Sequence, residues 1–323
     1  MRVVIAEFMA AEGLELLARG AQTRYDPGLG DDPPALAAAL AGADGLIVRN
    51  RARVDARLLH AAPRLRAVGR LGSGLDNLDL PRLAAAGIEV VSAPGVNAGA
   101  TAEFALCLAL ALARRLEPAW LGPRGPDFSG RAAYAGLELG GRTLGVVGLG
   151  RVGQALARKA RALGMTALAA QPRREAADGT AREVGAELVP LPELLRRSDV
   201  LSLHTPLTAE TRGLVGRREL ALLRPTAVLI NTARGGLIDE AALALALRER
   251  WLAGAALDVR DPEPPAQPDP LDGVPNLIRT PHVAGLTQEA QREASLVVAA
   301  GLLRVLRREE GRRGHAAAGA VRA

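Results

Sequence analysis

The feature that most constrains this chain is a glycine pattern near its middle, in the segment GVVGLGRVGQALARKARALG. An apolar run of strand character leads into Gly148, Gly150 and Gly153, and a segment with helical periodicity follows them. Between a strand and a helix, this G-x-G-x-x-G spacing is typical of a turn that binds a dinucleotide pyrophosphate. Gly148 permits the tight turn, Gly150 lets the backbone approach the anion, and Gly153 permits close packing of helix and strand.

The same alternation of strand and helix runs through almost the whole chain of 323 residues. Short β-branched or apolar runs predict strands, and Ala- and Leu-rich segments predict helices between them. The predicted strands are 3–7, 45–49, 65–71 and 88–93, followed by 143–149, 166–170, 199–204, 227–233, 253–259 and 276–281. The two series predict an α/β protein with two units of parallel sheet, whose ligands should bind at the carboxyl ends of the strands.

The net charge of +6 does not indicate a nucleic-acid partner. From Gly301 onward six arginines accompany two glutamates, so this tail carries most of the excess and residues 1–300 are nearly balanced. Only 2% of the residues are aromatic, which leaves few side chains for stacking on bases. We therefore expect no nucleic-acid partner.

The apolar segment over 100–118 predicts a buried helix, because its uncharged part, 104–113, is far shorter than the roughly 20 residues of a membrane span. Cys107, the only cysteine, lies within it, and we expect a buried small hydrophobe. No export signal is visible, and no Cys or His cluster suits a metal. We expect a cytoplasmic protein with neither membrane association nor a metal site.

The strand end in ALAAQPRR, residues 167–174, lacks the acid that usually follows such a glycine turn. An Asp or Glu there accepts hydrogen bonds from the ribose hydroxyls of NAD and repels a 2′-phosphate. Gln171 removes that repulsion, while Arg173 and Arg174 supply donors that suit a phosphate. We therefore expect NADP(H) to be favoured over NAD(H); the alternative is a neutral Gln171 that tolerates NAD(H).

Three further segments follow strands and contribute chemically distinct groups: Arg234 in NTARGG, Glu263 in ALDVRDPEP and His282 in TPHVAG. A guanidinium can bind a carboxylate bidentately and polarise a carbonyl. An imidazole, whose unperturbed pKa is near 6.5, can exchange a proton with the carbonyl oxygen, and a carboxylate can orient it. Together these groups suit hydride transfer to a 2-keto acid.

Six motifs in this order resemble the D-2-hydroxyacid dehydrogenases, and more narrowly the phosphoglycerate dehydrogenase and hydroxypyruvate/glyoxylate reductase branch. They are RLGSGLDNLDL (70–80), GLGRVG, LHTPLT (203–208), NTARGG, AALDV with EP, and TPHVAG, within a resemblance over about 44–290. The resemblance implies that Arg234, Glu263 and His282 are the catalytic triad. It implies further cofactor contacts from the following residues: Arg151, Val152, Thr205, Ala233, Asp258 and Gly285. It also implies substrate contacts from Arg49, Arg70 and the backbone N–H groups of Ser73 and Gly74.

The resemblance also implies an architecture and a homodimer. A Rossmann-type doubly wound parallel sheet, residues 98–285, is expected as an insertion into a flavodoxin-like substrate domain made of 1–97 and 286–310. Residues 311–323 are expected to form a flexible tail. The family's members usually dimerise through the nucleotide-binding domain.

Two residues depart from the family pattern. Arg250 replaces a glycine that usually ends a helix, which should alter a helix cap. Arg260 stands where Phe commonly follows the DV pair, and we expect an effect on substrate choice.

The sequence leaves more than one function open. The leading hypothesis is a reductase of small 2-keto acids such as hydroxypyruvate or glyoxylate, with phosphoglycerate oxidation as a variant of it. The alternative is an NAD(P)-sensing corepressor-like binding protein, because proteins of that kind share the fold and the triad. Formate oxidation is less compatible with the pair Glu263 and His282, because it protonates no carbonyl.

Overall fold

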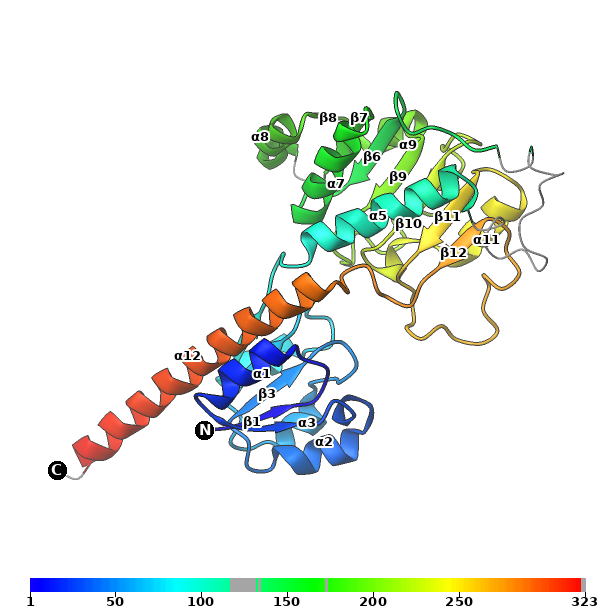
Figure 1. The fold of residues 1–323 in the computed structure, drawn as a ribbon. Coiled ribbons are helices and arrows are strands. Elements are labelled where there is room, and N and C mark those ends of the chain that lie inside the picture. The colour runs from blue at the N-terminus through cyan, green and yellow to red at the C-terminus, as the bar shows by residue number, and fades with distance from the viewer. Residues whose placement is uncertain (117–131, 133–134, 172–173, 321–323) are drawn as a thin grey trace. The chain divides into compact units, whose positions relative to one another are not determined.

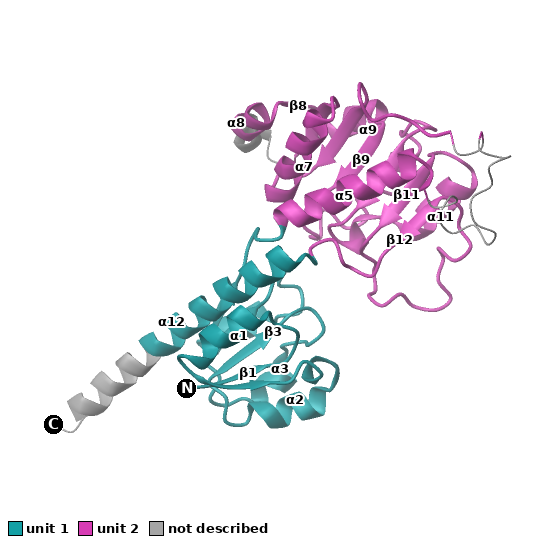
Figure 2. Ribbon diagram, viewed as in Figure 1, with its two compact units in different colours: residues 1–97, 286–323 teal, residues 98–285 magenta. Residues whose placement is uncertain are grey.

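The computed structural model describes residues 1–116, 132, 135–171 and 174–320. They form two compact units (Figure 2): unit 1 is Met1–Asn97 with Leu286–Ala323, and unit 2 is Ala98–Gly285. Each unit is a parallel sheet with helices on both faces, as the sequence predicted (Figure 1). In the described residues no helix is both long and apolar enough to cross a membrane.

Unit 1 has a five-stranded sheet in the order β2-β1-β3-β4-β5. Its strands are β1 (Arg2–Ile5), β2 (Gln22–Tyr25), β3 (Gly45–Val48), β4 (Ala67–Arg70) and β5 (Glu89–Ser92). Its helices are α1 (Ala11–Ala18), α2 (Pro33–Leu40), α3 (Ala56–His60), α4 (Leu80–Ala85) and α12 (Gln288–Ala320), with a 3₁₀ turn η1 (Leu29–Asp31). Val3 and Ile5 pack with α1 and α12, whereas Val4 packs with α2, α3 and α4. Successive side chains thus enter cores on opposite faces of the sheet.

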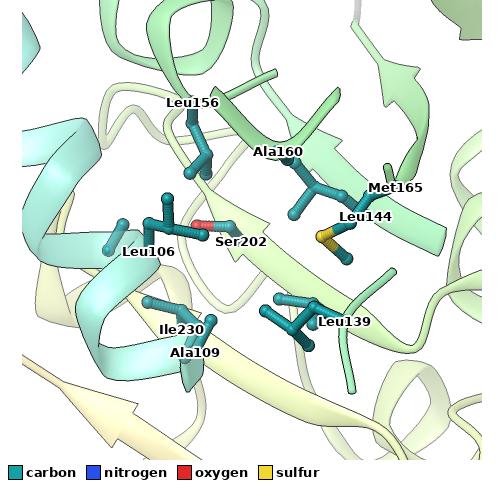
Figure 3. A pocket seen from close by; sticks show the side chains of 11 residues that line it. Leu106, Ala109, Leu139, Leu144, Leu156, Ala160, Met165, Ser202 and Ile230 are labelled. Atoms are coloured by element: carbon teal, nitrogen blue, oxygen red, sulfur yellow. The ribbon is translucent and has the colours of Figure 1, made fainter. Parts of the chain in front are cut away.

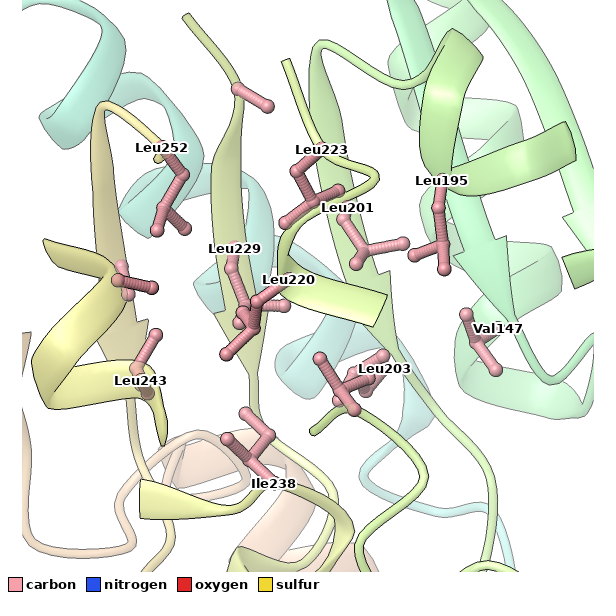
Figure 4. Close-up of a cluster of buried hydrophobic side chains, with 14 of the residues drawn as sticks. Val147, Leu195, Leu201, Leu203, Leu220, Leu223, Leu229, Ile238, Leu243 and Leu252 are labelled. Carbon is pink, nitrogen blue, oxygen red and sulfur yellow. The ribbon is translucent and has the colours of Figure 1, made fainter. Parts of the chain in front are cut away.

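Unit 2 has a seven-stranded sheet in the order β12-β11-β10-β9-β6-β7-β8. Its strands are β6 (Thr143–Val147), β7 (Thr166–Ala170), β8 (Ala186–Leu188), β9 (Val200–Leu203), β10 (Val228–Asn231), β11 (Gly254–Leu257) and β12 (Leu277–Arg279). Its helices are α5 (Ala98–Ala113), α7 (Arg151–Ala162), α8 (Arg174–Val184), α9 (Leu191–Arg197), α10 (Arg217–Leu220) and α11 (Glu240–Arg248), with a 3₁₀ turn η3 (Gly235–Leu237). Helices α5 and α7 cover one face, and a Leu-rich cluster joins α9, α10 and α11 to the other (Figure 4).

The order of the strands in unit 2 reverses next to β6. From this strand the chain runs outward through β7 and β8 on one side, and then returns to β9 on the other side. The carboxyl ends of β6 and β9 therefore flank a topological switch point, where open α/β sheets bind their ligands. This doubly wound arrangement agrees with the predicted fold class.

Two sequence-based predictions differ from the structure. Cys107 is exposed and not buried. Apart from Glu103, helix α5 has small or apolar residues on nearly every side, so its pattern gave little indication of which face meets the core. Helix α12 continues to Ala320, although a flexible tail was predicted from residue 311. No proline interrupts 311–320, and the run Ala316–Ala318 favours a helix.

Candidate active site

An imidazole–carboxylate pair lies beyond the carboxyl ends of β11 and β12 in unit 2. Nδ1 of His282 lies 2.8 Å from Oε2 of Glu263, and both side chains are 36% exposed. The other carboxylate oxygen, Oε1, accepts a hydrogen bond of 2.8 Å from the N–H of Arg260. Among the described residues none bonds Nε2 of His282, which leaves that nitrogen free to exchange a proton with a ligand.

The charges around Glu263 favour its ionised form. Burial alone raises the pKa of the Glu263 carboxyl, but the hydrogen bonds from His282 and from the Arg260 N–H outweigh it. The positive charge of Arg234 acts in the same direction, so the pKa lies below its ordinary value. An ionised carboxylate on Nδ1 fixes the tautomer of the ring and stabilises its protonated form.

The turn that carries His282 is held by hydrogen bonds to Asp258. His282 has φ of +56°, a left-handed conformation that is rare for a residue with a side chain. The buried carboxylate of Asp258 accepts from the hydroxyl of Thr280 at 2.6 Å and from the N–H of Ala284 at 2.8 Å. The family resemblance implied a cofactor contact for Asp258, and the bonds in the structure show that its carboxylate shapes the turn that carries His282.

Arg234 lies in the turn after β10, in the same unit. The buried Asn231 closes this turn: its Nδ2 donates to the carbonyl of Arg234 at 2.9 Å, and its Oδ1 accepts from the N–H of Ala233 at 3.1 Å. The guanidinium of Arg234 donates to the carbonyl of Ala233 at 2.6 Å. Asn231 was missed by the sequence analysis, although an Asn that precedes a turn is a recognisable signal.

The glycine turn between β6 and α7 has the geometry of a pyrophosphate site. Gly148 has φ of +95°, and a Cβ on it would lie 2.8 Å from the backbone of His204 and Thr205. A Cβ on Gly153 would clash with the carbonyl oxygen of Gly148, whereas a Cβ on Gly150 would meet nothing within 4 Å. The open space at Gly150, in front of the N-terminus of α7, fits an anion that the helix N–H groups can bind.

Other predicted cofactor residues lie near this turn or elsewhere along the same sheet edge. Arg151 and Val152 are in the first turn of α7, Thr205 follows β9, Ala233 follows β10, and Gly285 ends unit 2. Oε1 of Gln171 accepts from the N–H of Leu149 at 2.5 Å, so this side chain is tied to the glycine turn. Arg173 lies outside the described residues, and Arg174 begins α8.

His204, also on this edge, has a structural environment. Burial lowers its pKa to about 4, so the ring is neutral near pH 7, and its Nε2 lies 2.8 Å from the hydroxyl of Ser202. Ser202 itself lines a small apolar pocket between α5, α7 and the sheet (Figure 3). The pocket has no charged group and suits neither a nucleotide nor an acid. In the described chain no group of three or more His, Cys, Asp or Glu is arranged for a metal ion.

The predicted substrate residues Arg49, Arg70, Ser73 and Gly74 all lie in unit 1. Arg49 directly follows β3, and Arg70 ends β4 opposite Val48, so the two arginines occupy neighbouring strand ends. Nη1 of Arg49 donates to the Gln291 amide oxygen at 2.9 Å. The hydroxyl of Ser73 bonds the carbonyl of Ala93 and the side chain of Asn97, which orders the loop after β5.

Comparison with known proteins identifies the family. The family model described as "D-isomer specific 2-hydroxyacid dehydrogenase, NAD binding domain" matches residues 106–284, more than half of the chain. The chain belongs to the D-isomer specific 2-hydroxyacid dehydrogenases.

Its relatives differ in length and in named substrate. The chain is 42% identical to the (S)-sulfolactate dehydrogenase of Chromohalobacter salexigens over 94% of its own length and 98% of that protein. It is 40% identical to the glyoxylate reductase of Aeropyrum pernix, over 94% of this chain and 92% of that one. It is 37% identical to the D-3-phosphoglycerate dehydrogenase of Archaeoglobus fulgidus over 93% of its own length, but it spans only 56% of that longer protein.

Solved structures share the fold over most of the chain. The TT0316 protein from Thermus thermophilus is 36% identical with a TM-score of 0.85, covering 95% of this chain and 97% of that one. An acyclic imino acid reductase (Bsp5) in complex with NADPH and D-Arg is 25% identical with a TM-score of 0.80, covering 92% of this chain and 94% of that one. The NAD-dependent formate dehydrogenase of Staphylococcus aureus in complex with NAD is 28% identical with a TM-score of 0.80, covering 94% of this chain and 95% of that one.

Proposed function

We propose that the protein transfers a hydride between a nicotinamide cofactor and a small 2-keto or 2-hydroxy acid, such as hydroxypyruvate or glyoxylate. The observation that carries this proposal is the 2.8 Å contact between Nδ1 of His282 and the Glu263 carboxylate, on the same sheet edge as the glycine turn. Carbonyl reduction needs a proton at oxygen and a hydride at carbon. A carboxylate-supported imidazole is suited to the first requirement, and the bound nicotinamide supplies the second.

Each of the three side chains has a distinct task in this proposal. His282 gives the Nε2 proton to the carbonyl oxygen during reduction and takes it back during oxidation. Glu263 holds Nδ1–H and stabilises the charged ring that is present before His282 gives up the Nε2 proton in reduction. Arg234 donates two N–H groups to the substrate carboxylate, which orients the carbonyl for the transfer.

The first experiment measures kcat/KM for glyoxylate and hydroxypyruvate in wild type, H282Q, E263Q and R234Q. H282Q is expected to lose at least a hundredfold, because it binds ligands similarly but has no exchangeable ring proton. H204Q is the matched control, because His204 is neutral and bonds Ser202. Turnover by H282Q equal to that of H204Q contradicts the assignment. Cofactor binding by the wild type without turnover of any 2-keto acid favours the corepressor-like alternative.

We propose that NADP(H) is the preferred cofactor. Oε1 of Gln171 already accepts from the Leu149 N–H, so the Nε2 donors remain for a ligand. Donors suit a 2′-phosphate better than ribose hydroxyls that need an acceptor. Arg173 and Arg174 add positive charge in the adjacent sequence.

The effect of charge at position 171 on cofactor choice can be tested with a side chain of the same size. Q171E keeps an oxygen that accepts from Leu149 and adds a negative charge, so kcat/KM with NADPH should fall at least tenfold while that with NADH is kept or improved. R173A should reduce NADPH use alone. If wild type uses both cofactors equally and neither Q171E nor R173A changes this, NAD(H) is the better assignment.

A substrate with a second anionic group is a second candidate, and Arg49 favours it. This half-buried guanidinium makes its side-chain bond to the neutral Gln291, and burial lowers its pKa while the charge of Glu7 opposes that effect. An anionic ligand would compensate the burial of this charge. The test compares 3-phosphohydroxypyruvate and 3-sulfopyruvate with glyoxylate in wild type and R49Q. Selective loss in R49Q of activity with the two substrates that carry a second anionic group supports this candidate, and equal loss with all three contradicts it.

We also propose a homodimer formed through unit 2. Helix α5 carries one charged residue, Glu103, which pairs with Lys159, and on the same face Cys107 and Leu110 remain exposed. Exposed apolar side chains that lie together on a helix commonly mark a surface that a partner covers. Light scattering should give a dimer for wild type and for L163E, an exposed leucine after α7, but a monomer for L110E. A monomeric wild type contradicts the proposal.

A further inference from the structure

Arg260 lies in the loop that follows β11, three residues before Glu263, and its side chain is only 8% exposed. Nε and Nη2 donate to the two oxygens of Glu240 at 2.9 and 2.8 Å. Nη1 and Nη2 donate to the two oxygens of Asp269 at 3.0 and 2.7 Å. One planar guanidinium therefore binds two carboxylates bidentately, a geometry that no other side chain offers.

The partners of Arg260 lie on different elements. Glu240 is the first residue of α11, and Asp269 lies at the far end of the loop that contains Glu263. Asp269 also accepts from Arg279, at the end of β12, at 3.1 Å. The cluster thus fixes both ends of segment 260–269 to the body of unit 2, which restricts the conformations open to the segment.

The backbone of Arg260 connects this cluster to the triad. Its N–H donates to Oε1 of Glu263 at 2.8 Å, while Oε2 faces His282. Its carbonyl group lies where a Cβ on Gly235 would fall, so the turn carrying Arg234 packs directly on it. A shift of the Arg260 backbone would move the Glu263 carboxylate and disturb this packing.

We propose that Arg260 is a positioning residue: by clamping Glu240 and Asp269, it holds its own N–H where that group keeps the Glu263 carboxylate against Nδ1 of His282. This rests on the proposed function and adds to it a residue that touches no substrate. A Phe, which the family resemblance leads us to expect here, has no hydrogen bond to give to either carboxylate. The acidic pair Glu240 and Asp269 suits an arginine at this position.

The test is a double-mutant cycle with R260M and E263Q. For each variant, kcat/KM for reduction is measured as a function of pH. R260M is expected to lower kcat/KM at least tenfold and to move the alkaline limb of the profile to lower pH, because the imidazolium loses its fixed carboxylate. In the E263Q background, R260M should change kcat/KM less than twofold. The same loss in both backgrounds, or an unchanged pH profile, overturns the proposal.

R260M leaves Glu240 without its cation and Asp269 with Arg279 alone, so a second variant separates folding from positioning. The triple variant R260M/E240Q/D269N removes all three charges at similar volume and should unfold near the wild-type temperature. It should still show the shifted pH profile. Recovery of the wild-type profile by the triple variant would mean that Arg260 only balances charge, and would overturn the proposal.

A readout that is independent of turnover distinguishes this proposal from the proposed function. In wild type, the Nδ1 proton between His282 and Glu263 should give a strongly downfield proton resonance, absent in E263Q. R260M should weaken or lose that resonance, and its retention overturns the positioning role even if no 2-keto acid is turned over. Inactivity of wild type with every 2-keto acid, together with a resonance that depends on Arg260, rejects the proposed function alone.

Discussion

Asp258 holds His282 in a left-handed backbone conformation. The carbonyl of Asp258 accepts from the N–H of His282 at 2.8 Å, and its carboxylate accepts from Val283 and Ala284 at 2.9 and 2.8 Å. A non-glycine residue in this region costs on the order of 1–3 kcal/mol, which the surrounding bonds must offset. The position of the imidazole thus depends on an aspartate from the neighbouring strand end.

Removal of this carboxylate should destabilise the turn. D258A leaves the hydroxyl of Thr280 and two backbone N–H groups without their acceptor, so we expect a loss of about 2–4 kcal/mol in the free energy of unfolding. The value of kcat/KM should fall at least tenfold. Urea denaturation and steady-state kinetics measure the two effects. D272A, at an exposed acid of the same unit, is the control, and D258A as stable as D272A would refute this account.

Asp269 should make stability fall in acid. Hydrogen bonds from Arg260 hold the pKa of its carboxyl at about 2, below the ordinary 3.8; burial opposes the shift, and the Leu271 N–H and Arg279 add to it. A carboxyl with a depressed pKa stabilises the fold above its unfolded pKa, and this contribution disappears as pH falls through the folded pKa. We expect wild type to lose on the order of 1 kcal/mol from this group between about pH 4 and pH 2.

D269N isolates this contribution. The variant should be less stable than wild type at pH 7, and its free energy of unfolding should change less between about pH 4 and pH 2. Urea denaturation at a series of pH values measures both. Parallel curves for the two proteins across this window would show that Asp269 does not titrate as described.

The sequence predicts the interior strands of both sheets but misses two edge strands. Strands β2 (QTRY) and β8 (AEL) contain no buried residue, so neither has the apolar pattern that marks a buried strand. The predicted site residues follow strands, and parallel topology alone brings the ends of β10, β11 and β12 to one edge. The bond of the Arg260 N–H to Glu263 and the bonds of Asp258 to the His282 turn depend on loop conformations, which local sequence patterns do not encode.

The glycine turn permits a test of cofactor binding that leaves the fold intact. A Cβ at Gly150 meets no atom within 4 Å and the residue has φ of −72°, so G150A should unfold near the wild-type temperature. The added methyl would occupy space that the pyrophosphate needs, and we expect Kd for NADPH to rise at least tenfold. G153A should instead destabilise the fold, because its Cβ would clash with the Gly148 carbonyl. Unchanged NADPH affinity in G150A would place the pyrophosphate elsewhere.

Arg250 provides a stabilising substitution far from any proposed chemistry. Helix α11 ends at Arg248, and the exposed Arg250 adopts φ of +58° at the position where helices commonly end in glycine. R250G removes the steric cost of a side chain in this conformation, so the free energy of unfolding should rise by about 0.5–1 kcal/mol. E249G is the matched control: Glu249 has φ of −84°, and glycine there should lower stability by roughly the same amount. Thermal and urea denaturation measure the stability of both variants. A loss of stability in R250G as well as in E249G would mean that the conformation of Arg250 carries no strain.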